Sequence, residues 1–219
     1  MNTYKTYILA LFICTFSFST LSFAQSQQDA EAFIRQVLDK VQSYDNISID
    51  FQYILENTSE QIKQETKGDV ILEGEKYLLN LMGMTIMNDG KKLYTISPED
   101  EEVTISNYDP NDEEEITPSK MLTFYEEGYN FEMDIVQSLS GRKIQFVKLT
   151  PIDSNAEVKE IYLGVDKQTL HIHNLIQIDE SGTRVEIRVK SFKTNQPLGS
   201  KTFEFSEKKY SSYYINRLD

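Results

Sequence analysis

Regular alternation of apolar and polar residues over 47–57 is the feature that most constrains the fold. The odd positions from Ile47 to Leu55 are apolar, and the positions between them are polar except at Ile54. Because side chains along a β-strand point alternately to opposite faces, this stretch predicts a strand with one buried and one solvated face. Similar stretches recur along the chain, about ten in all, between short turns. The pattern favours a mainly antiparallel fold, either a sandwich or a barrel.

Two segments have helical spacing instead. Residues 26–43 carry an apolar stripe with period 3.6, and Ser26 with Asp29 has the spacing of a capping box at its start. Residues 117–128 begin with Thr117-Pro118-Ser119, which places Pro at the first helical position, and end at Gly128. This short second helix interrupts a β-rich sequence, so we expect it to cover one mouth of a curved sheet.

Residues 1–24 have the three parts of a secretory signal peptide. Lys5 precedes an apolar run from Tyr7 to Phe18, and small residues follow at Ser22 and Ala24. The run is too short for a membrane-spanning helix, which needs about 20 apolar residues; a short membrane anchor is the alternative. We expect cleavage near Ala24-Gln25, which leaves one exported domain over residues 25–219.

Composition argues against several classes of function. The formal charge of −13, from 35 acidic against 22 basic residues, disfavours unaided nucleic-acid binding. The single Cys allows no intramolecular disulfide. The two His, His171 and His173, would point to the same face of a strand and could be two legs of a metal site, but we favour an exposed pair. We therefore expect neither a metal nor another cofactor.

Catalytic motifs are missing from the sequence. It has no Gly-rich phosphate loop, no G-x-S-x-G elbow and no H-E-x-x-H, so we do not expect an enzyme. Residues 99–115 hold nine acidic residues and no Lys or Arg. They resemble the start of a calcium loop, but Glu114 and Lys120 stand where that loop needs Gly and Glu. The segment is a solvated loop or a docking site for a basic partner.

Residues 77–87 are apolar on both faces of a predicted strand pair. Together with the apolar side of the 117–128 helix, they supply more apolar surface than a one-sided sheet needs. Either the strands are covered on both faces, or they line a cavity for an apolar ligand, a role that suits adaptable Met side chains. The candidate cavity residues are Phe51, Tyr53, Leu72, Tyr77, Leu79, Met82, Met84, Ile86, Met121, Leu122, Phe124 and Tyr125.

The order and spacing of several weak motifs resemble the periplasmic outer-membrane lipoprotein carrier (LolA) family, as a divergent branch. The resemblance covers nearly all of the chain after the signal peptide. It is carried by the helix end Leu38-Asp39-Lys40-Val41-Gln42-Ser43-Tyr44, the strand over 49–53, Lys67-Gly68-Asp69-Val70, Met87-Asn88-Asp89-Gly90-Lys91-Lys92-Leu93-Tyr94 and Thr117-Pro118-Ser119-Lys120-Met121-Leu122. Phe203-Glu204-Phe205 is similar to the family's late aromatic strand, so we expect a strand there.

This resemblance implies a single curved antiparallel sheet that forms an incomplete β-barrel covered by lid helices. It also implies that the cavity binds the acyl chains of lipoproteins and ferries them through the periplasm, from an inner-membrane donor complex to an outer-membrane acceptor. The best-known members place Arg-Pro soon after their Gly-Asp strand, where this chain has Glu73-Gly74-Glu75. The alternatives are a carrier of another lipid, or an envelope interaction protein on the same scaffold that uses the acidic 99–115 loop.

Overall fold

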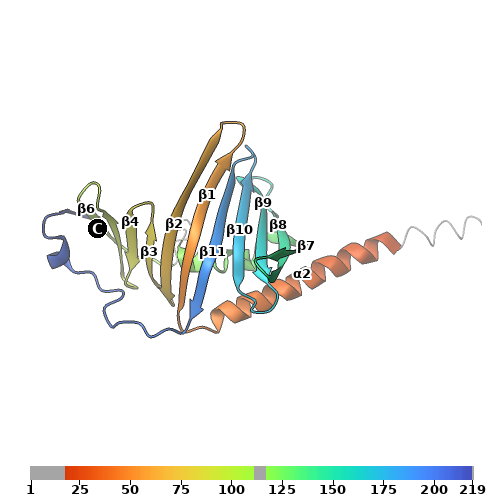
Figure 1. Ribbon diagram of the computed structural model, residues 1–219, viewed down its shortest axis with the longest axis horizontal. Coiled ribbons are helices and arrows are strands. Elements are labelled where there is room, and N and C mark those ends of the chain that lie inside the picture. The colour runs from red at the N-terminus through yellow and green to blue at the C-terminus, as the bar shows by residue number, and fades with distance from the viewer. Residues whose placement is uncertain (1–17, 111–116, 219) are drawn as a thin grey trace, which may run out of the picture.

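The computed structural model describes residues 18–110 and 117–218. Within these ranges one open sheet of 12 strands forms the body of the protein, in the order β12-β6-β5-β4-β3-β2-β1-β11-β10-β9-β8-β7 (Figure 1). Every pair is antiparallel except β12 with β6. The strands are β1 (Ile47–Asn57), β2 (Ile62–Glu73), β3 (Lys76–Leu81), β4 (Met84–Asn88), β5 (Lys92–Ser97), β6 (Glu102–Asn107), β7 (Tyr129–Leu139), β8 (Arg142–Pro151), β9 (Val158–Asp166), β10 (Ile172–Asp179), β11 (Arg184–Thr194) and β12 (Tyr214–Leu218). The single unclosed sheet with few helices confirms the expected fold class.

Two meanders make up this sheet except for β12, which is added beside β6. Strands β1 to β6 follow one another through short turns, and so do β7 to β11. The meanders meet where β1 pairs with β11, with Phe51 opposite Val189. The predicted Asp-Gly hairpin joins β4 to β5: Gly90 has a φ of 90°, and the Asp89 carboxylate accepts the backbone N–H groups of Lys91 and Lys92. Local turn chemistry therefore fixes most of the strand order.

Helix α2 (Phe18–Gln42) packs on the β7–β10 end of the sheet (Figure 1). The expected apolar stripe is present, since Ala30, Ile34 and Val37 are almost fully buried in a core with Val147 and Leu163. The expected start at Ser26 is wrong for the full chain, because the helix already begins at Phe18. No Gly or Pro precedes Ser26 in this stretch to stop the helix.

The two faces of β3 have different covers. Leu79 packs with Phe51 on what we call the inner face, whereas Leu78 and Met87 pack on the opposite, outer face. The outer face is covered by the segment after β11, whose Phe205 ring stacks on Tyr94 at 4.4 Å between centroids. Residues 77–87 therefore pack on both faces of the sheet, and whether the inner face also holds a ligand stays a prediction. The expected strand over 203–205 is wrong: these residues form no strand, and Phe205 instead packs its ring onto the outer face.

The second predicted helix is shorter than expected. It forms α3 (Pro118–Met121) and then a 3₁₀ turn, η1 (Phe124–Glu126), before Gly128 at a φ of 86°. Thr117 caps α3, since its hydroxyl accepts the Lys120 backbone N–H at 3.2 Å. A further 3₁₀ turn, η2 (Glu207–Tyr210), lies in the segment that covers the outer face.

Candidate ligand cavity

An apolar cavity of about 200 Å³ lies on the inner face of the sheet. Its walls come from both meanders, and α3 with the residue after it forms the cover. None of the described side chains that line it is charged. The lining residues are Ile49, Phe51, Tyr53, Val70, Leu72, Leu79, Leu81, Pro118, Met121, Leu122, Leu163, Ile172, Leu175, Ile187 and Val189.

Strand periodicity places these side chains. Ile49, Phe51 and Tyr53 are alternate residues of β1, so they share one face of the sheet. The strand register continues this face onto β2 and β11, because Phe51 lies opposite Gly68 on one side and Val189 on the other. Val70 lies opposite Leu79 in turn. A continuous apolar surface results from pairing strands whose apolar positions are in phase.

The lid helix α3 lies at the surface over the cavity. None of its four residues is buried, and Met121 with Pro118 covers the cavity through half-exposed side chains. The Ser119 hydroxyl donates to the Gly74 carbonyl at 3.2 Å, in the turn between β2 and β3. This turn is the Glu73-Gly74-Glu75 stretch that lacks the family's Arg, so a neutral hydrogen bond joins the lid to it.

Six of the twelve expected cavity residues line the cavity, namely Phe51, Tyr53, Leu72, Leu79, Met121 and Leu122. Two more lie in the packing around it: Tyr77 is buried and Ile86 is partly buried in the same apolar cluster. Whether these residues bind a ligand remains a proposal.

The other four expected residues lie elsewhere. Phe124 and Tyr125 follow the lid and pack into the core beneath α2. Met82 and Met84 stand at the β3–β4 turn with 55% and 38% of their surface exposed. The 3₁₀ turn at η1 changes the helical phase after α3, which directs Phe124 and Tyr125 away from the cavity.

Sequence reasoning also missed nine lining residues. Ile49 belongs to the predicted alternation over 47–57, and Ile187 and Val189 alternate with polar residues in the same way, so the signal for all three is present in the sequence. Predicting that they face the cavity requires the strand order, which places β11 beside β1. The others are Val70, Leu81, Pro118, Leu163, Ile172 and Leu175.

A second, open groove of about 680 Å³ adjoins the cavity at the β3–β4 turn. We call it the edge groove. Its polar lining includes Lys67, Asp69 and Asn80, and the Asn80 amide donates to the Asp69 carboxylate at 2.9 Å. Phe51 and Leu81 line both the edge groove and the cavity. The two spaces are therefore neighbours separated by apolar side chains.

Tyr125 carries a buried polar atom close to this apolar region. Its side chain is fully buried, and its hydroxyl has no hydrogen-bond partner among the described residues. Burial raises the pKa of the phenol, so the group is neutral at physiological pH. The hydroxyl is an uncompensated polar group in the core.

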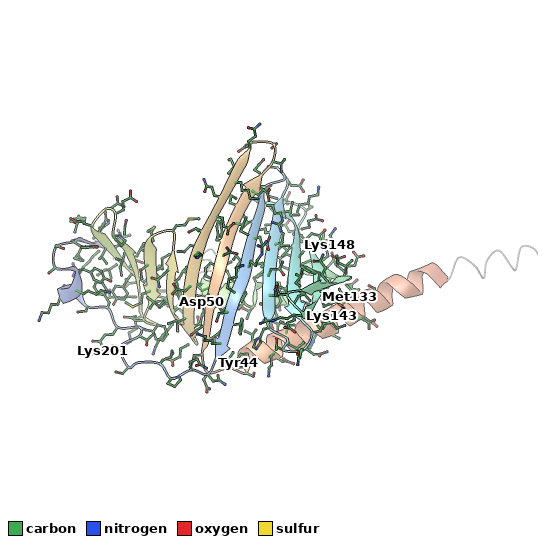
Figure 2. All side chains as sticks on the ribbon, in the orientation of Figure 1. Tyr44, Asp50, Met133, Lys143, Lys148 and Lys201 are labelled. Atoms are coloured by element: carbon green, nitrogen blue, oxygen red, sulfur yellow. The ribbon has the colours of Figure 1, made fainter. Side chains whose placement is uncertain are left out.

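The two His do not form the expected exposed pair. His171 is half-buried: its ring stacks on Phe192 at 4.3 Å, and its Nε2 lies 2.8 Å from the hydroxyl of Tyr44, which Figure 2 labels near the end of α2. Burial and the charge of Lys40 lower the pKa of His171. His173 contacts the Asn174 side chain instead, with Nδ1 at 3.2 Å from Oδ1.

Residues 18–110 and 117–218 contain no group of three or more His, Cys, Asp or Glu placed to hold a metal ion. Over the same ranges, no helix has the length and apolar character needed to cross a membrane. The segment 111–116, which holds four acidic residues of the predicted acidic loop, lies outside the described residues.

Comparison with known protein families gives one match. The family described as outer membrane lipoprotein carrier protein LolA matches residues 42–206. The chain belongs to the LolA family. The match spans β1 to β11 and includes every described residue that lines the cavity. A search of curated proteins gives no match.

Solved structures show the same fold at low sequence identity. An uncharacterized conserved protein from Thermus thermophilus superposes with a TM-score of 0.57 at 11% identity, covering 84% of this chain and 98% of that one. The Mycobacterium tuberculosis lipoprotein LppX superposes with a TM-score of 0.50 at 14% identity, covering 80% and 99%. These likenesses establish the fold of this LolA-family chain and nothing finer.

Proposed function

We propose that this chain is a carrier that holds acyl chains in the inner-face cavity. The observation that carries the proposal is the lining itself: every described residue around the cavity is apolar apart from the Tyr53 hydroxyl, and a short helix with no buried residue covers it. Such a site offers nothing to a charged or strongly polar ligand. Membership of the LolA family supports the same class of ligand.

The hydrophobic effect supplies the affinity for such a ligand. Each methylene that leaves water is worth about 0.8 kcal/mol, so ten buried methylenes give roughly 8 kcal/mol before the cost of ordering the chain. The same quantity explains why an acyl anchor needs a protein cavity to move through water. A carrier is therefore a physically sufficient role for this site.

The cavity must enlarge to accept such a chain. Its volume of about 200 Å³ is below the roughly 300–1,000 Å³ of typical small-molecule sites. The sheet is one hydrogen-bonded unit, whereas α3 is attached through half-exposed side chains and the Ser119–Gly74 hydrogen bond. We expect α3 to be the part that moves.

The finer form of the proposal is transport of lipoproteins. After removal of residues 1–24, the chain would receive acylated proteins from an inner-membrane complex and deliver them to an outer-membrane acceptor across the periplasm. The family description, outer membrane lipoprotein carrier protein, supports this cargo and its destination. The protein would act by binding and release, without catalysis.

Displacement of a fluorescent fatty acid from the purified protein tests the acyl-binding site. Met121→Glu places a charge in the cavity wall from a helix with no buried residue, so it should leave the fold intact and reduce affinity at least tenfold. Leu218→Glu is the control, since Leu218 lies on β12 with 54% of its surface exposed. Equal affinity for both variants, or no binding by the wild-type protein, would contradict the proposal.

A further inference from the structure

Strand β2 has a free edge beside the edge groove. It pairs with β1 along residues 62–72 but with β3 only along residues 68–73. Among the residues that the structure describes, 62–67 therefore have a strand neighbour on one side only. Figure 1 shows β1 and β2 continuing past the ends of β3 and β4. The side chains of Lys63, Glu65 and Lys67 along this edge are exposed.

The hydrogen-bonding phase of β2 identifies which backbone groups face outward. In a hairpin with a two-residue turn, the residues that flank the turn exchange both backbone hydrogen bonds. Glu73 and Lys76 flank such a turn, so residues 73, 71 and 69 of β2 direct their N–H and C=O groups toward β3. The same alternation directs those of Lys67, Glu65 and Lys63 toward the free edge. Among the described residues, the Thr66 hydroxyl lies 3.5 Å from the Lys67 carbonyl oxygen at this free edge.

The free edge begins where the cavity meets the edge groove. Lys67 and Gly68 of β2 line the groove, and Phe51, which lines both spaces, lies directly opposite Gly68. A Cβ at position 68 would lie 2.5 Å from Cζ of Phe51, so the ring occupies the place that a side chain would take. An acyl chain that passes Phe51 into the cavity would thus leave its polar end beside Lys67.

We propose that the free edge of β2, from Lys63 to Lys67, binds the polypeptide of an acylated cargo as an added strand while the acyl chains occupy the cavity. This inference rests on the proposed carrier function. A peptide that leaves the cavity at the edge groove runs along this edge, where three residues offer outward N–H and C=O groups. Main-chain hydrogen bonds do not depend on the sequence of the added strand, and this suits a carrier whose cargoes share an acyl anchor and differ in sequence.

Charged side chains make the edge selective for anchored peptides. Exposed Lys side chains on an edge strand oppose non-specific pairing with other strands, and Lys63 and Lys67 lie on this edge. A peptide tethered through its acyl chains is instead held at an effective concentration in the millimolar range, which favours a pairing that is weak for a free peptide. The edge therefore contributes when the cavity is occupied.

Two probes separate this inference from the carrier function. One is a diacylglycerol with a fluorescent acyl chain; the other is a ten-residue peptide whose N-terminal Cys carries the same diacylglyceryl group. We expect the lipopeptide to slow amide hydrogen exchange at residues 63, 65 and 67, and the lipid alone to leave it unchanged. We also expect the lipopeptide to bind more tightly than the lipid.

Glu65→Pro tests the edge directly. It removes an outward N–H and no N–H that pairs with β1, so the fold should persist, as circular dichroism can verify. Lipid affinity should equal that of the wild type, and lipopeptide affinity should fall about 5- to 10-fold. Glu65→Ala is the matched control: it removes the same carboxylate, keeps the N–H, and should bind both probes as the wild type does.

Each result decides between the two proposals. If the wild type binds the lipid but its edge amides exchange equally with either probe, the strand-addition proposal is overturned and the carrier function stands. If the wild type binds neither probe, both fail together. The exchange measurement uses the wild-type protein, so it decides the question even if Glu65→Pro does not fold.

Discussion

Replacing Gly68 by Ala should distort the junction between the cavity and the edge groove. The new Cβ would lie 2.5 Å and 2.8 Å from Cζ and Cε2 of Phe51 and 2.9 Å from the Asn80 carbonyl oxygen. Ordinary carbon contacts are about 3.5–4.0 Å, so the ring must retreat by about 1 Å into the cavity. Overpacking of this kind costs about 1–3 kcal/mol. For a chain of this size, each kcal/mol lowers Tm by about 2–4 °C, which gives a loss of about 2–12 °C.

Thermal unfolding followed by circular dichroism measures this loss, and binding of a fluorescent fatty acid should weaken in parallel. Gly199→Ala is the control, because a Cβ there would meet its nearest neighbour, Oγ1 of Thr202, at an ordinary 3.7 Å. Phe51→Leu alone should destabilise the protein by about 1–2 kcal/mol, through lost burial. In the Gly68→Ala background it should cost less, because the smaller side chain relieves the clash.

Two results would refute this reasoning. If Gly68→Ala melts at the same temperature as Gly199→Ala, the close approach of Phe51 carries no energetic weight. If the effects of Gly68→Ala and Phe51→Leu simply add, the ring is not the group that the new Cβ displaces. The contact with the Asn80 carbonyl is unaffected by Phe51→Leu, so the relief should be partial.

Three further substitutions test the core, the outer face of the sheet and the lid. Tyr125→Phe removes a buried hydroxyl without a partner among the described residues and should raise stability by about 1 kcal/mol or more; a lower Tm would contradict this. Burial tends to raise the pKa of Glu186, but hydrogen bonds from Arg188 and Arg184 outweigh it and hold that pKa below its usual value. The carboxylate therefore stabilises the fold fully above the unfolded-state pKa of about 4.3, so Glu186→Gln should cost about 1–3 kcal/mol at neutral pH. Urea titrations should show this difference shrinking as the pH falls below that value and through the lower folded-state pKa; a pH-independent difference would argue against it. Ser119→Ala removes the lid's hydrogen bond to the β2–β3 turn and should speed release of a fluorescent fatty acid about 2- to 10-fold in stopped-flow measurements; an unchanged release rate would mean that this bond does not hold the lid.

The alternation over 47–57 predicted β1 correctly, and its one irregularity has a structural reason. Ile54 points to the outer face, where it lies opposite Glu186 and is buried like that residue. Arg184 and Arg188 pair with the same carboxylate at 2.6 Å and 2.9 Å. The outer face is therefore packed at this point, which no single strand could reveal.

Strands β7 and β12 were not predicted, for two different reasons. In β7 the register shifts between Met133 and Val136, which breaks the alternation on which prediction relies. Strand β12 is short and pairs in parallel with β6, a partner far away in the sequence. Of the expected cavity residues, Phe51, Tyr53, Leu72, Leu79 and Met121 line the cavity from β1, β2, β3 and α3. Phe124 and Tyr125 do not, because they follow a change of helix type that a continuous pattern conceals.

The pairing of β1 with β11 has a consequence for how the molecule acquires its activity. Each meander can form from local contacts, but the junction joins strands near opposite ends of the chain, and closing so long a loop is intrinsically slow. Leu79 from one meander and Leu175 from the other both line the cavity. An emerging chain therefore has no complete binding site until β11 has appeared. Cargo binding should accordingly stabilise the folded state, since a ligand that binds only the finished cavity shifts the folding equilibrium toward the native protein.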